Sequence, residues 1–128
     1  MAVGFGLDLT KRHLQSSLKA KGLPWERSKA FDGAAVFSDF VTFNGQVDDL
    51  RLELRINERL VQQGGCDLMM YKPNDILAEV KSFLSLEDGD LIMTGTPAGV
   101  GPVHAGDRFS GKILENEALI VEGSWVVK

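Results

Sequence analysis

Leu50-Arg51-Leu52-Glu53-Leu54-Arg55-Ile56 alternates apolar and charged residues without a break. Alternation with a period of two places the apolar side chains on one face of a β-strand and the charges on the other. The residues that follow, Asn57-Glu58-Arg59, indicate a tight connection to a second strand over Leu60 to Gln63. This stretch therefore predicts an antiparallel hairpin with one face packed against a core.

Further strands are predicted on both sides of this hairpin. They are expected over Val36 to Phe43, Asp90 to Thr96, Arg108 to Leu114 and Leu119 to Val127. Most connections between them are too short for the crossovers that join parallel strands. We therefore expect an α+β protein that is rich in β-structure, with a mixed but mostly antiparallel sheet.

Two helices are predicted from apolar spacing and end signals. The first is expected from Leu9 or Thr10 to Lys21, with Gly22 just past its end. The second is expected from Asn74, as its N-cap, to about Leu84. Its apolar residues follow the spacing of a helix face that packs on a core: Ile76, Leu77, Val80, Phe83 and Leu84.

Composition bounds the class of protein. The 128 residues are 44% hydrophobic and 25% charged, which predicts one globular domain over residues 1–128. The net charge of −4 argues against nucleic acid as a partner. No apolar run approaches the roughly 20 residues of a membrane span, and the start does not resemble a signal peptide. With Cys66 as the single cysteine, an internal disulfide is excluded. We expect a cytoplasmic protein without a membrane partner.

Asp8 ends an apolar, glycine-rich segment and is expected to begin the first helix. Helical phase from this residue gives one polar stripe, formed by Asp8, Arg12, Gln15 and Lys19. It gives a second, apolar stripe formed by Leu7, Leu14 and Leu18. Either the polar stripe faces a substrate cleft, or Asp8 only complements the helix N-terminus with Arg12 as its partner.

Basic residues gather at the same place. Between Asp8 and Lys29 there are six basic and two acidic residues, a net charge of +4, which leaves −8 for the rest of the chain. A local basic field suits a small anionic substrate such as a keto acid. The same pattern is also typical of a solvated helix face.

Two other segments contain groups that bind ions. The turn Thr94-Gly95-Thr96-Pro97-Ala98-Gly99-Val100-Gly101 can present backbone N–H groups to an anion, but it lacks the Gly-Lys-Ser/Thr of a nucleotide-binding loop. Glu115-Asn116-Glu117 places two carboxylates on alternate residues. In a strand they share a face and suit a metal, whereas at a hairpin end they are simply solvated.

Three blocks of this sequence resemble the fumarylacetoacetate hydrolase family, and in particular its smaller members that act on acylpyruvates and related 2-oxo acids. They are Gly6 to Gln15, Lys29 to Asp32, and Gly89 to Gly101. The resemblance covers essentially the whole chain in the right order and spacing. It implies a β-rich roll or pseudo-barrel with two or three short helices, and a homodimer.

The resemblance also implies site residues. Asp8 matches a metal ligand, Lys29 and Thr96 match catalytic residues, and Arg12, Gln15, Gly95 and Thr96 match substrate-binding positions. The implied cofactor is Mg²⁺, Mn²⁺ or Ca²⁺, which the family holds with this aspartate and a Glu-x-Glu pair. That pair lies upstream of the aspartate, and only seven residues precede Asp8. We therefore expect this chain to be a single domain that lacks the Glu-x-Glu ligands.

The implied activity is metal-dependent hydrolysis of a C–C bond in an acylpyruvate or fumarylpyruvate type of 2,4-dioxo acid, through an enolate. Decarboxylation of oxaloacetate and isomerisation or decarboxylation of a hydroxymuconate are alternatives within the family. A non-catalytic fragment or dimerisation module is an alternative of another class, because the Glu-x-Glu pair is absent. A small-anion binder that uses Arg12, Lys29 and the Gly95 to Gly101 turn is a further one.

Overall fold

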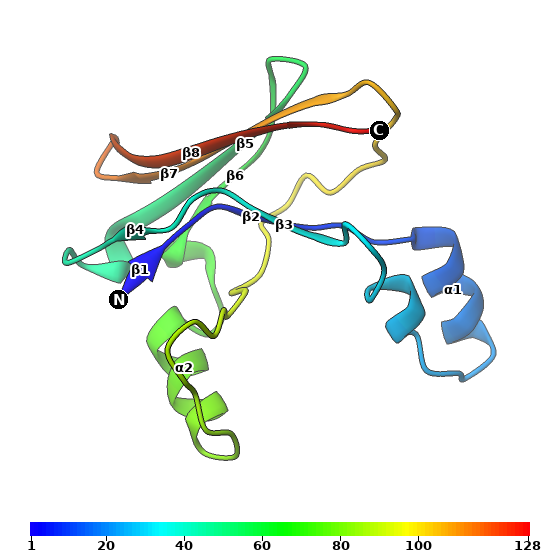
Figure 1. Cartoon of the computed structure of the whole chain (residues 1–128), viewed down its shortest axis with the longest axis horizontal. Helices are drawn as coiled ribbons and strands as arrows, with labels where there is room; N and C mark the ends of the chain where they lie inside the picture. Colours follow the sequence, from blue (N-terminus) through cyan, green and yellow to red (C-terminus); the bar gives the residue numbers. More distant parts are fainter.

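The computed structural model describes all residues from 1 to 128. Two helices, α1 (Arg12–Ala20) and α2 (Pro73–Lys81), and three 3-10 turns, η1 (Glu26–Ser28), η2 (Val47–Asp49) and η3 (Cys66–Leu68), accompany the strands. The strands are β1 (Ala2–Val3), β2 (Gly6–Asp8), β3 (Ala35–Phe37), β4 (Val41–Thr42), β5 (Leu50–Ile56), β6 (Arg59–Gly65), β7 (Arg108–Glu115) and β8 (Ala118–Val126). The α+β class with antiparallel pairing is confirmed, and the sheets do not close into a barrel (Figure 1).

A four-stranded antiparallel sheet in the order β6-β5-β7-β8 forms one layer. The alternating stretch Leu50–Ile56 is the central strand β5, as predicted. Its apolar face points into the molecule, where Leu54 is buried, while Arg51 is exposed. The strands predicted over Leu60 to Gln63, Arg108 to Leu114 and Leu119 to Val127 are present as β6, β7 and β8, with small differences at their ends.

Both hairpins of this sheet close with two residues in the left-handed region. Asn57 and Glu58 have φ values of 50° and 67°, and Asn116 and Glu117 have values of 46° and 72°. Two successive positive φ values make a type I′ turn, whose twist matches the twist of the flanking strands. Glu117 is therefore at a hairpin turn and not in a strand. The pair Glu115 and Glu117 lies at a hairpin end, so the interpretation in which the two carboxylates share one face of a strand is wrong.

Glu117→Gly is expected to stabilise the protein, because glycine adopts a φ of 72° without the steric cost that glutamate meets there. We expect the free energy of unfolding, measured in urea, to rise by about 0.5–1 kcal/mol. Ala118→Gly, one residue further and inside β8, is the control and is expected to lower it. A Glu117→Gly protein that is no more stable than the unchanged chain contradicts this prediction.

The second layer is a long antiparallel ribbon formed by the N-terminal strands. β1 pairs with β4 and β2 pairs with β3. Val3 pairs with Val41 but Gly6 pairs with Phe37, so the returning chain carries one extra residue between the two strand pairs. The single strand predicted over Val36 to Phe43 is therefore two strands separated by a bulge. At the bulge the Ser38 hydroxyl accepts a hydrogen bond from the Phe5 N–H at 2.9 Å.

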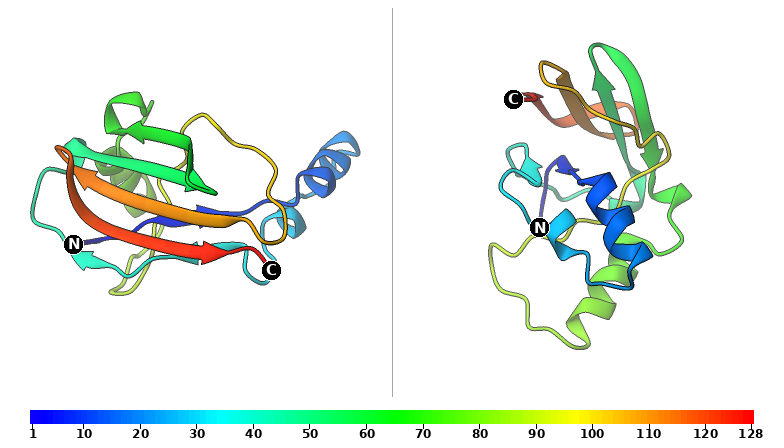
Figure 2. Two further views of the ribbon diagram at one scale, coloured as in Figure 1. Left: turned by 90° about the horizontal axis from the view of Figure 1, so that it is seen from above. Right: turned by 90° about the vertical axis from the view of Figure 1, so that its right-hand side faces the viewer.

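The core lies between the ribbon and the sheet (Figure 2). Phe5 and Leu7 of the ribbon pack against Leu54 and Phe109 of the sheet, and all four are buried. A Cβ atom at Gly111 would collide with the Phe5 ring, so only glycine lets the two layers approach at this point. The packing fixes β2 against the sheet, and with it the position of Asp8 at the end of this strand.

Helix α1 begins later than predicted, at Arg12. The Leu9 N–H donates to the Ala34 carbonyl at 2.8 Å and the Lys11 N–H donates to the Ser28 carbonyl at 3.0 Å, which holds residues 9–11 outside the helix. The predicted stripes that start from Asp8 and Leu7 are therefore wrong, because both residues lie on β2. The predicted end is confirmed: the N–H groups of Gly22 and Leu23 bond to the carbonyls of Lys19 and Leu18 in a Schellman motif.

Helix α2 also differs from its prediction. Its N-cap is Lys72 and its first residue is Pro73, a position where proline costs no hydrogen bond. The Asp75 carboxylate accepts a hydrogen bond from the Lys72 N–H at 3.1 Å, so the helix starts before Asn74 and ends at Lys81. No residue of α2 is buried, and the helix projects away from the sheet (Figures 1 and 2). Its apolar face does not pack on the core of this chain.

The strand predicted over Asp90 to Thr96 is absent. This segment approaches its neighbours through side chains and not through paired backbones: Met93 lies beside Gly6, and Thr96 and Pro97 lie beside β6. Gly95, inside this segment, has a φ of 113°, which interrupts an extended strand, and Gly89 just before it has a φ of 101°. Neither helix of the fold is long and apolar enough to cross a membrane.

Candidate active site

The most direct contact among the predicted site residues joins Asp8 and Lys29. The Lys29 ammonium lies 2.7 Å from Asp8 Oδ2, and the two side chains are 32% and 51% exposed. Asp8 is the last residue of β2, and Lys29 directly follows the 3-10 turn Glu26–Ser28. Ser28, with no exposed surface, anchors that turn. A partly exposed ammonium on a rigid support is a fixed positive charge at the surface of the fold.

Arg12 and Gln15 form a second pair at the start of α1. Arg12 Nη1 donates to Gln15 Oε1 at 3.1 Å, and Gln15 is the one buried residue of this helix. The bond uses one N–H of the guanidinium, which leaves the other N–H groups for a carboxylate. The Lys11 N–H bonds to the Ser28 carbonyl, so the start of α1 lies against the segment that carries Lys29.

The structure places Thr96 apart from these two pairs. Thr96 is exposed, and its hydroxyl oxygen accepts a hydrogen bond of 2.8 Å from Gln62 Nε2 on β6. No hydrogen bond joins Thr96 to Asp8, Lys29 or Arg12. Gly95 is exposed and adopts a φ of 113°, with open space where a Cβ atom would lie. The predicted site residues thus form two joined pairs and one separate loop.

Gln62 is a contact of this loop that sequence reasoning missed. It bonds to Thr96 and also donates to the Pro97 carbonyl at 2.8 Å. No local signal for it was available: a two-residue turn alone pairs Val61 with Leu54, and the β-bulge at Val61 puts Gln62 opposite the buried Leu54 instead, on the apolar face of the sheet. A polar side chain on that face needs a hydrogen-bonding partner.

A complete metal site is not formed by these residues. No three His, Cys, Asp or Glu side chains come together anywhere in the structure. Asp8 supplies one carboxylate, and one of its oxygens already accepts a hydrogen bond from Lys29. Protein sites for Mg²⁺ or Ca²⁺ are built from several oxygen ligands, so a divalent cation does not fit the residues of this chain alone.

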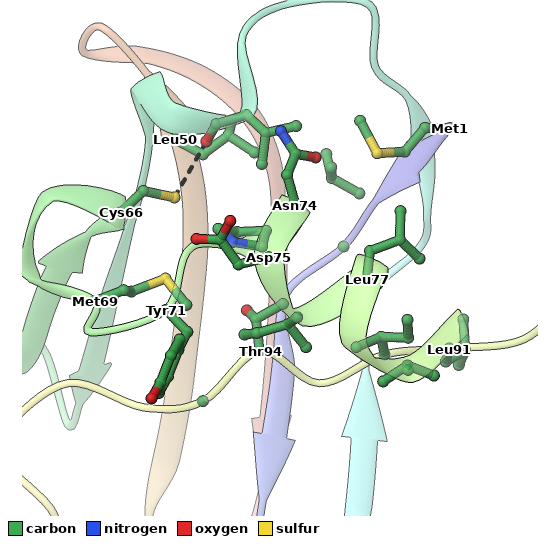
Figure 3. Close-up of a pocket in the computed structure, with 18 of the residues that line it drawn as sticks. Met1, Leu50, Cys66, Met69, Tyr71, Asn74, Asp75, Leu77, Leu91 and Thr94 are labelled. Carbon is green, nitrogen blue, oxygen red and sulfur yellow. Dashed lines mark hydrogen bonds between the residues drawn. The ribbon is translucent and has the colours of Figure 1, made fainter. Parts of the chain in front are cut away.

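A hollow of the molecule lies away from these pairs. It is an open groove of about 1960 Å³ between α2, β1 and residues 87–97 (Figure 3). Leu77, Leu91 and Met1 give it an apolar lining, and Thr94 to Thr96 form part of its edge. Asp8, Arg12 and Lys29 do not line it. Its size and openness do not suit a small anion, which favours the charged pairs as the binding site.

Cys66 lines this groove, and its surroundings do not favour a nucleophilic thiolate. It is buried, and its thiol donates to the Val47 carbonyl at 3.2 Å. Burial raises the pKa of the Cys66 thiol, and the negative charge of Asp48 adds to that rise. Because the thiolate is the reactive form, a raised pKa keeps Cys66 unreactive.

Comparison with curated proteins finds enzymes of 2-oxo acid metabolism. The chain is 41% identical over 127 residues to a mitochondrial oxaloacetate tautomerase of Saccharomyces cerevisiae, covering 94% of this chain and 49% of that protein. It is 39% identical over 123 residues to an oxaloacetate tautomerase of Escherichia coli, covering 91% and 56%. It is 37% identical over 109 residues to a fumarylpyruvate hydrolase of Ralstonia sp, covering 84% and 57%. The chain spans about half the length of these relatives.

Solved structures and a family model agree with this result. A protein of Oleispira antarctica, proposed to be a fumarylacetoacetate isomerase/hydrolase, matches with a TM-score of 0.95 and 40% identity over 99% of this chain and 58% of the other. A fumarylpyruvate hydrolase of Pseudomonas aeruginosa, solved in complex with Mn²⁺ and pyruvate, matches with a TM-score of 0.84 and 32% identity over 98% and 53%. The model of the fumarylacetoacetate (FAA) hydrolase C-terminal region matches residues 3–126. The chain therefore belongs to the fumarylacetoacetate hydrolase family, whose members are enzymes that act on oxo acids.

Proposed function

We propose that this chain forms the cationic side of an active site for a small 2-oxo acid that reacts through its enol or enolate. The observation that carries the proposal is the Lys29 ammonium, fixed 2.7 Å from Asp8 and still 32% exposed. A cation already held in position stabilises negative charge as it develops on the substrate oxygen, without reorganising in the transition state. The proposal thus gives Lys29 the catalytic role that the family resemblance implies for it.

Arg12 and Gln15 are proposed to bind the carboxylate of the substrate. The Gln15 amide oxygen fixes one guanidinium nitrogen, and the remaining N–H groups of Arg12 can hold a carboxylate bidentately. The first turn of α1 contains no acidic residue, so the positive end of the helix dipole adds to the charge of Arg12. This part of the protein favours an anion.

Tautomerisation of oxaloacetate is our first candidate reaction. Two of the relatives described above are oxaloacetate tautomerases. In this reaction a proton leaves C3 of the keto form and a proton is added to the C2 oxygen, so no water attacks and no C–C bond breaks. Hydrolysis of a fumarylpyruvate type of substrate, the first prediction from the sequence, is the second candidate, because another relative has that activity. Both reactions need the C2 oxygen to be stabilised when it carries negative charge.

One relative, a fumarylpyruvate hydrolase, was solved in complex with Mn²⁺ and pyruvate. In this chain Asp8 is the one carboxylate at the proposed site, and Mg²⁺, Mn²⁺ or Ca²⁺ needs further ligands from outside these 128 residues. The same shortage of carboxylates favours the alternative that the chain is a non-catalytic module. An assay in a longer protein separates the two proposals.

The test is a chimera in which this chain replaces the part that it matches in the Escherichia coli tautomerase, 56% of that protein. The decay of the enol absorbance of oxaloacetate is followed with Mn²⁺ present, and release of pyruvate from acetylpyruvate is followed in parallel. We expect the chimera to accelerate at least the first reaction. A folded chimera that accelerates neither, while the parent enzyme does, shows that the chain is a scaffold.

We also propose that the chain associates with itself. Only 12 of its 128 residues are buried, and the groove beside α2 leaves Tyr71, Phe83 and Leu91 exposed at 69%, 67% and 51%. So small a core leaves little stability to tolerate exposed apolar surface. We expect a dimer or larger species at micromolar concentration in sedimentation velocity, with little stabilisation by Mg²⁺. A compact monomer whose melting temperature rises by many degrees in millimolar Mg²⁺ contradicts both expectations.

A further inference from the structure

Gln62 occupies an unusual place in the four-stranded sheet. It pairs with Leu54 while Leu60 pairs with Arg55, so Val61 is an extra residue and forms a β-bulge. Residues that lie directly opposite each other share a face of the sheet, which puts Gln62 on the same face as the buried Leu54. Val61 packs against the core on that face as well. The bulge therefore turns two successive side chains inward, and one of them is polar.

Both amide hydrogens of Gln62 are donated to the loop that contains Thr96 and Pro97. Nε2 donates to Thr96 Oγ1 at 2.8 Å and to the Pro97 carbonyl at 2.8 Å. A carbonyl oxygen can only accept, so Pro97 fixes which end of the amide faces the loop. The group that faces Thr96 is then necessarily a donor.

Two glycines hold the loop against β6 at this point. A Cβ atom at Gly64 would lie 2.8 Å from Pro97 Cβ, and a Cβ atom at Gly99 would collide with the Val61 carbonyl. The loop residues just after Thr96 thus lie against β6 on either side of Gln62. Separating the Gln62 amide from the Thr96 hydroxyl would require the loop to move away from β6.

We infer that Gln62 is a positioning residue that makes the Thr96 hydroxyl a hydrogen-bond donor toward an anionic oxygen of the substrate. Because Oγ1 already accepts from Gln62, the hydroxyl hydrogen must point elsewhere, and the exposed Thr96 side chain presents it to solvent. A donor fixed in this way selects a carboxylate or enolate oxygen. The inference rests on the proposed function and on the substrate-binding role that the family resemblance implies for Thr96. It adds that the Thr96 hydroxyl acts as a hydrogen-bond donor.

The test uses the chain itself and oxalate, a stable anion whose oxygens resemble those of an enolised 2-oxo acid, titrated by calorimetry without added metal. Gln62→Glu replaces the donor with a carboxylate, which turns the Thr96 hydrogen away from the ligand. At pH 7.5 we expect this variant to bind oxalate about tenfold more weakly than the unchanged chain. Thr96→Val is expected to lose a similar factor, and adding Gln62→Glu to Thr96→Val should lose no more.

Two comparisons separate positioning from a merely structural or electrostatic effect. At pH 5 the carboxyl group that Gln62→Glu introduces can be protonated and donate again, so this variant should regain part of its affinity relative to the unchanged chain, whereas Gln62→Met should not. Gln63→Glu adds the same charge one residue away on the opposite, exposed face, where Gln63 pairs with Glu53. It is expected to bind oxalate within about twofold of the unchanged chain.

The outcomes distinguish a failure of the role inferred for Gln62 from a failure of the proposed function. Three results overturn the role of Gln62 and leave the proposed function standing. They are equal oxalate affinities for Gln62→Glu and Gln63→Glu, a full additional loss of affinity when Gln62→Glu is added to Thr96→Val, and no recovery of affinity by Gln62→Glu at pH 5. An unchanged chain that does not bind oxalate at millimolar concentration overturns the proposed function and this inference with it.

Discussion

Lys29→Met in the chimera is expected to lower kcat for oxaloacetate tautomerisation by about a hundredfold or more, and to leave KM within a few fold. The reason is that the ammonium meets negative charge that is present mainly in the transition state. Methionine keeps the length of the side chain and removes its charge. Asp8 is 51% exposed, so its carboxylate stays hydrated without the lysine and the fold is expected to survive.

Lys21→Met is the matched control for this change. Lys21 lies in the same basic stretch, at the end of α1, and its side chain is exposed and forms no ion pair. We expect Lys21→Met to keep kcat within about twofold, because a remote exposed charge is screened by solvent. If Lys29→Met raises KM and leaves kcat unchanged, Lys29 binds the ground state and has no catalytic role.

The isolated 128-residue chain is expected to turn over acetylpyruvate extremely slowly, at least about a thousandfold below the 10 s⁻¹ or so that is usual for enzymes. Only Asp8 represents the family's metal ligands, and no cluster of three ligating side chains exists. The Lys29 ammonium also competes with a cation for the Asp8 carboxylate. We therefore expect this chain to bind a substrate anion without turning it over at an appreciable rate.

Pyruvate release from acetylpyruvate, followed with millimolar Mn²⁺ and with EDTA, measures this expectation. The chimera serves as the positive control in the same assay. Turnover by the isolated chain near 1 s⁻¹ or faster, dependent on Mn²⁺, contradicts it and means that the chain assembles a metal site by itself.

The sheet was the most predictable part of the fold, and the reason is local. In β5 the alternation of Leu50 to Ile56 specifies which face is buried, and the turn Asn57-Glu58 specifies the direction of the next strand. Both signals lie within ten residues of each other. Strands β7 and β8 have the same kind of signal around Asn116 and Glu117.

The wrong predictions concern segments whose structure depends on distant partners. The apolar run Leu91-Ile92-Met93 has the composition of a strand, but it docks through the side chains of Met93, Thr96 and Pro97 and pairs with no backbone. Helix α1 starts late because Ser28 and Ala34 bond to the residues before it. Neither contact can be read from local periodicity.

In the candidate site, too, the residues themselves were predictable from the sequence, whereas their contacts with distant residues were not. Family resemblance supplied Asp8, Arg12, Gln15, Lys29 and Thr96, and the structure joins the first four into two pairs. One of the two interpretations of Asp8 paired it with Arg12, four residues away, whereas its partner is Lys29, twenty-one residues away. Gln62 escaped notice because its role depends on a bulge and on a loop thirty-four residues further along the chain.

The most direct test of the central claim is a titration of the isotopically labelled chain with pyruvate, followed by NMR. If the Asp8–Lys29 and Arg12–Gln15 pairs and the Thr96 loop bind a 2-oxo acid, we expect the largest changes in chemical shift at Arg12, Gln15, Lys29 and residues 95–97. The exposed outer face of the sheet around Arg51 stays unchanged. Shift changes confined to the groove lined by Leu77 and Leu91, or none at millimolar pyruvate, contradict the assignment of the site.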